Sequence, residues 1–193
     1  LSGFTTFRLG GKCPALLSCQ TPQQLQQAIQ FCIDQNQKFI LIGGGSNLVV
    51  SDQGVDCLVI RYVSETPLIE QQGNDMIVTG STLLDDLAKY AADNGLEGLN
   101  SMTGIPGTVG GAIAGNAGAF GKQIGDVVKS VNIIRRKHIN TPPILKELSS
   151  KNLHFAYRNS ILKQTGDIVV SAKIILKLGD RKKLQKERND ILT

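Results

Sequence analysis

Apolar positions in the first third of the chain form short runs on either side of one helically spaced segment. Residues 15–19, 38–42 and 57–61 are mostly apolar runs of strand length, which is typical of buried strands. Thr21 followed by Pro22 predicts a helix start, because threonine caps free N–H groups and proline suits the first helical position. The helix should continue to about residue 35 through residues at helical spacing, namely Leu25, Ala28, Ile29 and Cys32. The pattern predicts a βαβ-like unit with a parallel pair of strands.

A turn cluster at residues 71–75 follows this unit, and we expect the boundary between two subdomains just before it, at Thr66-Pro67. The first subdomain then covers residues 1–66. The second covers residues 67–180 and is expected to be an α+β unit with a mainly antiparallel sheet. Residues 181–193 are expected to start a charged helix.

Within the second unit, the spacing of apolar residues predicts one helix and three strands. Residues 82–94 have the spacing of an amphipathic helix that stops at Asn94-Gly95, and residues 76–79, 127–135 and 167–178 indicate strands. Residues 146–151 predict a single helical turn.

Composition and charge narrow the class of protein. The chain has 41% hydrophobic and 19% charged residues and a mean hydropathy of −0.03, as globular proteins do, and its longest strictly apolar runs are far shorter than a membrane span. Of the net charge of +5, residues 181–193 supply +3, from five Lys/Arg against two Asp/Glu. With no Trp and only three Tyr and six Phe, the chain lacks the stacking surface of a nucleic-acid binder. We expect no nucleic-acid or membrane partner, and a monomer.

The four cysteines lie in apolar surroundings without a Cys-x-x-Cys pair, at positions Cys13, Cys19, Cys32 and Cys57. This spacing favours reduced cysteines packed as small apolar side chains, not a metal site or disulfides. We therefore expect a cytoplasmic protein without a metal. Because the first residue is Leu1, we also expect the sequence to begin inside a longer gene product.

Two glycine-rich segments suggest an anionic ligand. A predicted strand runs into residues 43–47, Gly-Gly-Gly-Ser-Asn, whose backbone N–H groups could form an anion-binding concavity for a diphosphate. The dinucleotide pattern G-x-G-x-x-G and the hydrolase pattern G-x-S-x-G both fail, because residue 48 is Leu48. A tight turn without a ligand is the alternative for this loop alone.

The second segment makes that alternative weaker. Nine of the 21 glycines lie between Gly98 and Gly125, and between residues 104 and 121 small residues predominate. A flat apolar ligand could lie against such backbone, which we interpret as a shaped loop. Two glycine loops on separate subdomains predict a long cofactor held between them, while a packing crossover without a ligand remains the alternative.

Four segments in order resemble the UDP-N-acetylenolpyruvoylglucosamine reductase family, and the resemblance runs from about residue 4 to residue 178. They are residues 6–11 (Thr-Phe-Arg-Leu-Gly-Gly), residues 43–48 with Asp52 after them, residues 104–121, and residues 155–160 (Phe-Ala-Tyr-Arg-Asn-Ser). The resemblance implies the two-subdomain α+β fold of the vanillyl-alcohol-oxidase (PCMH) type, with bound FAD and with NADPH as reductant. It implies cofactor contacts from Gly43, Gly44, Gly45, Ser46, Asn47, Leu48, Gly80, Ser81, Gly104, Ile105, Pro106, Gly107, Val109, Gly110, Gly111, Asn116, Ala117 and Gly118.

For the reaction, the resemblance implies reduction of UDP-N-acetylglucosamine enolpyruvate to UDP-N-acetylmuramate in peptidoglycan synthesis. Arg158 would be the catalytic arginine, because a guanidinium stays charged and can stabilise the charge that develops beside the substrate carboxylate. Tyr157, Arg158 and Phe120 would contact the UDP-sugar. The family often has Tyr where Phe120 stands and commonly Asp where Asn159 stands, so the hydrogen bonds that Tyr and Asp would make in the family are not carried over to this sequence.

The proton that completes the reaction has no evident donor in the sequence. We expect His138 and His154 to be structural. The family's serine motif, Gly-Ser-Phe-Phe-Lys-Asn-Pro, is not found in the sequence, and Ser160 is not assigned its role. We therefore expect residues 181–193 to lead into an absent substrate-binding domain, and this chain alone to be inactive. Another FAD oxidoreductase of the same fold, or a non-catalytic nucleotide-binding module, remains the alternative.

Overall fold

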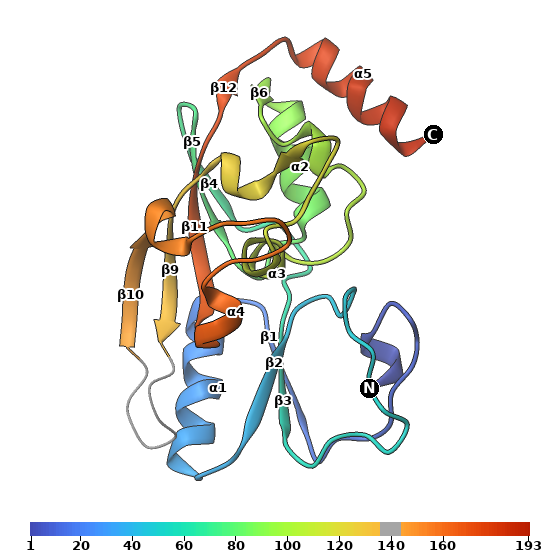
Figure 1. Ribbon diagram of the computed structural model, residues 1–193, viewed down its shortest axis with the longest axis vertical. Coiled ribbons are helices and arrows are strands. Elements are labelled where there is room, and N and C mark those ends of the chain that lie inside the picture. Colours follow the sequence, from blue (N-terminus) through green and yellow to red (C-terminus); the bar gives the residue numbers. More distant parts are fainter. Residues whose placement is uncertain (136–143) are drawn as a thin grey trace.

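The computed structural model describes residues 1–135 and 144–193, which form two main sheets, each with its own helices, and two small two-stranded sheets. Figure 1 shows the smaller sheet with α1 in the lower half and the larger sheet with α2, α3 and α5 in the upper half. The N-terminus lies beside the lower half, and the C-terminus ends α5 at the top. His138 lies outside the described residues.

The first unit consists of three parallel strands and one helix, β1 (Leu16–Cys19), α1 (Pro22–Asp34), β2 (Phe39–Ile42) and β3 (Leu58–Tyr62). The strand order is β1-β3-β2, so β3 lies between the two earlier strands and pairs with both in parallel. Thr21 caps α1 in a capping box with Gln24, whose side chain accepts from the Thr21 N–H. The predicted helix start is thus confirmed, as are the three strands to within a residue or so.

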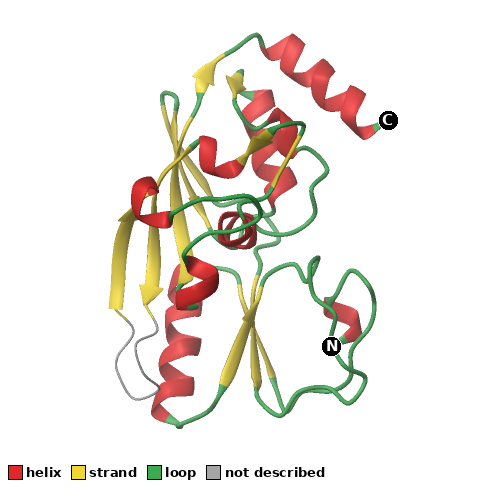
Figure 2. Ribbon diagram, viewed as in Figure 1, coloured by secondary structure: helices red, strands yellow, loops and turns green. Residues whose placement is uncertain are grey.

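The second unit is an antiparallel sheet of five strands in the order β10-β9-β11-β5-β4. Its strands are β4 (Ile69–Gln72), β5 (Asp75–Thr79), β9 (Val128–Arg135), β10 (Ile144–Ser149) and β11 (Ile168–Ile175). Figure 2 shows this sheet as the long yellow ribbons that run from the top down the left side of the molecule.

One sequence prediction was largely wrong in this sheet. Residues 146–151 were expected to form a helical turn, but residues 146–149 belong to β10, which pairs with β9 in antiparallel register, and the helical turn is η4 (Ser150–Leu153). Only Leu148 of that strand is buried, so an exposed edge strand has too few apolar positions to show its alternation. The turn expected at residues 71–75 is present but shorter: it covers residues 73–74, between Gln72, which ends β4, and Asp75, which begins β5.

The helices of the second unit are α2 (Leu84–Asp93), α3 (Val109–Gly115), α4 (Leu162–Thr165) and α5 (Arg181–Leu192). Short 3₁₀ turns and two-residue strands complete the described chain: η1 (Ser2–Phe4), β6 (Leu96–Glu97), η2 (Asn100–Met102), β7 (Gly118–Ala119), β8 (Lys122–Gln123), η3 (Ile124–Asp126), η4 (Ser150–Leu153) and β12 (Lys177–Leu178). The sequence predicted α2 and α5 but treated α3 as loop. Its glycines and small residues give a weak helical signal, and Thr108 caps it by accepting from the Gly111 N–H.

Two apolar cores hold the units together. The larger lies between the antiparallel sheet, α2 and α3. The smaller contains α1 and β3, but it also includes Ile134 of β9 and Ile168 and Val170 of β11. Cys19 and Cys32 are buried in this smaller core, whereas Cys13 and Cys57 are partly exposed. The second sheet therefore supplies part of the core of the first.

A buried hydrogen bond joins the two sheets at this shared core. The Tyr62 hydroxyl, at the end of β3, donates to the Val170 carbonyl of β11 at 3.0 Å, and the same carbonyl accepts from the Gly80 N–H. Tyr62 is 2% exposed, and burial raises its pKa from 10.0 to about 12.

Among the described helices, none is long and apolar enough to span a membrane.

We predict that Tyr62→Phe lowers the free energy of unfolding by about 1 kcal/mol at neutral pH, because one buried hydrogen bond is lost. Between pH 10 and about 12 the unfolded tyrosine loses its proton while the folded one keeps it, so this group's contribution to stability falls as pH rises. Tyr62→Phe should therefore lose less stability than the unsubstituted chain as the pH rises from 10 to about 12, because its phenylalanine has no proton to lose. Urea unfolding across this range tests it, with exposed Tyr157→Phe as the control; equal alkaline losses in Tyr62→Phe and the unsubstituted chain would contradict it.

Candidate cofactor site

A cleft of about 570 Å³ lies where the two units meet. The first unit contributes the second residue of its glycine loop, the end of β3 and the segment after it. The second unit contributes the start of α2 and the second glycine loop. The cleft is lined by Thr6, Ser18, Gln20, Gly44, Ser46, Arg61, Val63, Ser64, Glu65, Leu83, Asp85, Ile105, Pro106 and Gly107.

The two predicted glycine loops contact each other directly at this cleft. A Cβ on Gly44 would lie 3.2 Å from Cα of Gly107, and the Ser46 hydroxyl donates to the Pro106 carbonyl at 3.1 Å. Gly107 has a φ of 115°, a conformation that other residues rarely adopt. Side chains at Gly44 or Gly107 would force the loops apart, so the glycines are required by the approach of one backbone to the other.

Several hydrogen-bond donors at this cleft have no partner within the described residues. None of the N–H groups of residues 44–47 donates to another described group. In β3 and just after it, Nε of Arg61 and Oγ of Ser64 are buried and without a hydrogen bond to any described residue. A buried donor without a partner costs free energy, so these groups suit a ligand rich in acceptors. FAD, with its diphosphate, ribitol and ribose oxygens, fits this donor set.

Arg61 and Ser64 were not among the site residues predicted from the sequence. A signal for Arg61 was present: it is the charged residue in the otherwise apolar strand Leu-Val-Ile-Arg-Tyr, and an arginine half-buried there needs an acceptor. Ser64 had no signal, because a serine between a strand and a turn is ordinary. Its burial, with 3% exposed, comes from the packing of the second unit. The Ser64 N–H donates to the Ser81 carbonyl at 3.0 Å.

Two carboxylates, Glu65 and Asp85, also line the cleft. Arg188 of α5 donates to both oxygens of Asp85 at 2.7 Å. These hydrogen bonds lower the pKa of Asp85 from 3.8 against the opposing effect of burial, with a further contribution from the Gly104 N–H. The carboxylate nearest to the second glycine loop is thus ionised and paired with a guanidinium.

Other predicted cofactor residues make internal contacts. The Ser81 hydroxyl donates to the Gln20 carbonyl at 2.7 Å, which joins the two units. The N–H groups of Val109 and Gly110 donate to the carbonyls of Thr82 and Gly80, and a Cβ on Gly110 would lie 3.1 Å from the latter oxygen. The first turn of α3 is therefore occupied by protein acceptors.

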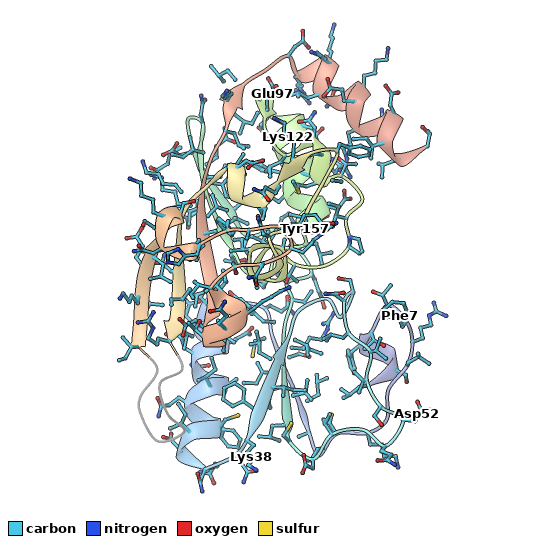
Figure 3. All side chains as sticks on the ribbon, in the orientation of Figure 1. Phe7, Lys38, Asp52, Glu97, Lys122 and Tyr157 are labelled. Atoms are coloured by element: carbon cyan, nitrogen blue, oxygen red, sulfur yellow. The ribbon has the colours of Figure 1, made fainter. Side chains whose placement is uncertain are left out.

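The predicted substrate residues lie at the other end of α3. Figure 3 shows Tyr157 beside α3, whereas Phe7 lies on the N-terminal segment of the lower half. Tyr157 and Arg158 form the tip of a tight turn closed by reciprocal backbone hydrogen bonds between Ala156 and Asn159. The Arg158 guanidinium carbon lies 6.0 Å from the centre of the Tyr157 ring, and Tyr157 is 88% exposed.

Asn116, at the C-terminal end of α3, connects this turn to the hairpin that carries Phe120. Its buried side-chain amide donates to the Ala156 carbonyl at 2.8 Å and to Oε1 of Gln123 at 2.7 Å, and it accepts from the Gly125 N–H at 3.1 Å. Phe120, at the hairpin turn, is 76% exposed. Asn116 thus occupies a structural position beside the predicted substrate residues.

The remaining predicted residues flank these features. Asn47 is exposed after the first glycine loop and Leu48 is half-buried beside it, while Ala117 and Gly118 lead from α3 into the hairpin. Ser160 is fully buried and donates to the Ala114 carbonyl at 2.8 Å. In the described residues no group of three or more His, Cys, Asp or Glu side chains is arranged to hold a metal ion.

Two glycine loops in contact, at a cleft with donors that have no partner in the described part of the chain, are typical of a cofactor-binding domain, and comparison with known proteins identifies its class. Residues 14–137 match the family described as FAD binding domain. The chain belongs to this family.

Comparison with individual proteins gives a narrower class than the family does. Over 99% of its length the chain is 32% identical to a UDP-N-acetylenolpyruvoylglucosamine reductase of Alkaliphilus oremlandii, of which it covers 61%. The crystal structure of this reductase from Thermus caldophilus is 31% identical, with a TM-score of 0.79, and the chain covers 65% of it. The chain thus spans about three fifths of the curated relatives that it matches.

A more distant structural neighbour shows how widely the fold is shared. 6-Hydroxy-D-nicotine oxidase from Arthrobacter nicotinovorans is 17% identical, with a TM-score of 0.61 over 84% of this chain and 36% of its own. At that identity the likeness shows the fold alone. The predicted α+β fold of the vanillyl-alcohol-oxidase (PCMH) type is confirmed.

We predict that Asn116→Ala lowers the free energy of unfolding by about 3 kcal/mol, because three hydrogen bonds of a buried amide are lost and alanine must adopt a left-handed backbone. Denaturant unfolding measures the loss. The matched control is Asn36→Ala, where asparagine has the same backbone conformation, with a φ of 49°, but is exposed. That change should cost only about 1 kcal/mol, and a similar cost at both positions would contradict the role of the Asn116 amide.

Proposed function

We propose that this chain is the FAD-binding part of a UDP-N-acetylenolpyruvoylglucosamine reductase that uses NADPH. The observation that carries the proposal is the cleft itself, where two glycine loops meet beside buried donors that have no partner among the described residues. The similarity to the reductases over nearly the whole chain supports the choice among enzymes of this fold.

Different residues of the cleft would bind different parts of the cofactor. The N–H groups of residues 44–47 and the Arg61 guanidinium would hold the diphosphate, since backbone nests and arginine both favour phosphate oxygens. Ser64 would donate to a hydroxyl or phosphate oxygen of the cofactor. Ile105 and Pro106 offer an apolar wall for a flat ring.

When bound, FAD would supply the chemistry of hydride transfer from NADPH to the enolpyruvyl double bond. Arg158 would pair with the substrate carboxylate and stabilise the negative charge that develops on the adjacent carbon, which then gains a proton to give the lactyl ether. The exposed turn that carries Arg158 leaves its side chain open to a large substrate. Ser160 is not suited to give the proton, because its buried hydroxyl already donates to Ala114. We propose that another group of the full-length enzyme does so.

For the cofactor, we predict opposite effects of two serine substitutions. Ser64→Ala should weaken FAD binding about tenfold while leaving the cofactor-free chain as stable or more stable, since it removes a buried hydroxyl that has no hydrogen-bond partner among residues 1–135 and 144–193. Ser81→Ala should instead lower the free energy of unfolding by about 1 kcal/mol, because its hydroxyl has partners. Titration by quenching of flavin fluorescence, with urea unfolding of the cofactor-free chain, measures both.

Three other results of the FAD titration would contradict part of the proposal. A chain that takes up no FAD would overturn the proposed function. Binding of ADP without binding of FAD would indicate a non-catalytic nucleotide-binding module. Unchanged FAD affinity in Ser64→Ala would remove Ser64 from the site.

For the reaction, we predict that Arg158→Lys in the full-length enzyme slows substrate reduction on the order of a hundred- to thousandfold, because lysine keeps the charge but loses the planar pair of donors. Reduction of the flavin by NADPH should be largely kept. Stopped-flow measurement of the two half-reactions separates them, and equal losses in both would show that the change damages the fold.

A further inference from the structure

Asp85, in the first turn of α2, joins helix α5 to the second glycine loop. Arg188 of α5 donates to it from both terminal nitrogens, Nη1 to Oδ1 and Nη2 to Oδ2, each at 2.7 Å. The N–H of Gly104 donates to Oδ1 at 2.8 Å. Arg188 Nη1 also donates to Oγ1 of Thr103, the residue before Gly104, at 3.3 Å. One carboxylate thus receives donors from both the helix and the loop.

The loop needs such an external contact to keep one shape. Gly104 has a φ of 72° and Gly107 a φ of 115°, and glycine backbone has little preference of its own between such conformations and others. The intervening Ile105 and Pro106 line the cleft together with Asp85. A hydrogen bond at Gly104 therefore fixes the entry to the part of the loop that forms the cleft wall.

The ion pair also bears on the charge of the cleft. The cofactor's diphosphate is an anion, and an unpaired Asp85 carboxylate on the wall would repel it. Arg188 counters that charge in bidentate geometry, the strongest arrangement for such a pair. The Arg188 side chain is only 11% exposed, whereas that of Asp85 is 39% exposed, so solvent reaches the pair from the carboxylate side and screens it in part.

We propose that Arg188 and Asp85 are positioning residues for the cofactor: through them, α5 holds the Gly104 loop in its binding shape and cancels a negative charge at the cleft. This inference rests on the proposed function, because it takes FAD as the occupant. It assigns to the charged C-terminal helix a role in cofactor affinity, although its own side chains are not among those that line the cleft.

The same pair of helices supplies a matched control. Gln185 of α5 donates from Nε2 to Oδ1 of Asp93 at 2.8 Å, at the far end of α2 from Asp85. This contact also joins α5 to α2, but it does not reach the glycine loop. Loss of Gln185 should loosen the helix pair without changing the cleft.

The test compares Arg188→Met with Gln185→Met in the whole chain. Methionine keeps an apolar stem in both positions and removes the polar contacts. Arg188→Met should raise the Kd for FAD about tenfold or more, and Gln185→Met should change it less than about twofold. Arg188→Lys, which keeps the charge but not the bidentate geometry, should lie between Arg188→Met and the unsubstituted chain.

A second readout needs no cofactor. Hydrogen exchange of the Gly104 amide in the cofactor-free chain should become faster in Arg188→Met and stay unchanged in Gln185→Met, because only the former loosens the acceptor of that N–H. This measurement separates positioning of the loop from a general loss of stability, which would accelerate exchange across α2 and α5 alike. If Arg188→Met does not fold, Arg188→Lys provides both readouts.

The outcomes distinguish this inference from the proposed function. An unsubstituted chain that binds no FAD overturns both. An unsubstituted chain that binds FAD, with an unchanged Kd in Arg188→Met, overturns the positioning role alone. Equal effects of Arg188→Met and Gln185→Met on FAD affinity also overturn it, because they would show that α5 acts through general stability.

Discussion

The direct contact between two glycine loops is the constraint on which the rest of the structure depends. Gly44 and Gly107 come from different units, and their backbones approach as closely as they do because neither has a side chain. Such an approach requires the two sheets to be held at a fixed spacing. Close to the cleft, two hydrogen bonds hold the sheets at that spacing: the buried one from the Tyr62 hydroxyl to the Val170 carbonyl, and the one from the Ser64 N–H to the Ser81 carbonyl.

The two loops differ in what remains available to a ligand. The N–H groups at the start of α3 are used by acceptors of the protein, whereas those of residues 44–47 donate to no described group. In the proposed function, the first loop and Arg61 therefore hold the anion, and the second loop forms part of the cleft wall. This division explains why both loops are rich in glycine although one contributes mainly shape.

The sequence predicted the elements whose signals are local, and it failed where tertiary contacts decide. Thr21-Pro22 predicted the start of α1, and the spacing of apolar residues predicted α2, because a cap or an amphipathic face depends only on residues close together in the sequence. β10 was missed because an exposed edge strand buries so little, and α3 because glycine-rich segments have weak helical propensity. The glycine loops were predicted from their composition, but Ser64 was not, since only packing of the second unit buries it.

Helix α3 connects the two halves of the proposed chemistry. Its N-terminal cap, Thr108, lies against Gly43 of the first glycine loop, and its C-terminal cap, Asn116, holds the turn of Arg158. With seven residues the helix is about 10 Å long. A rigid element of that length sets the separation between the cofactor cleft and the arginine. Because both caps are buried, a change in either would move one half relative to the other, and alignment of a substrate with the cofactor depends on such distances.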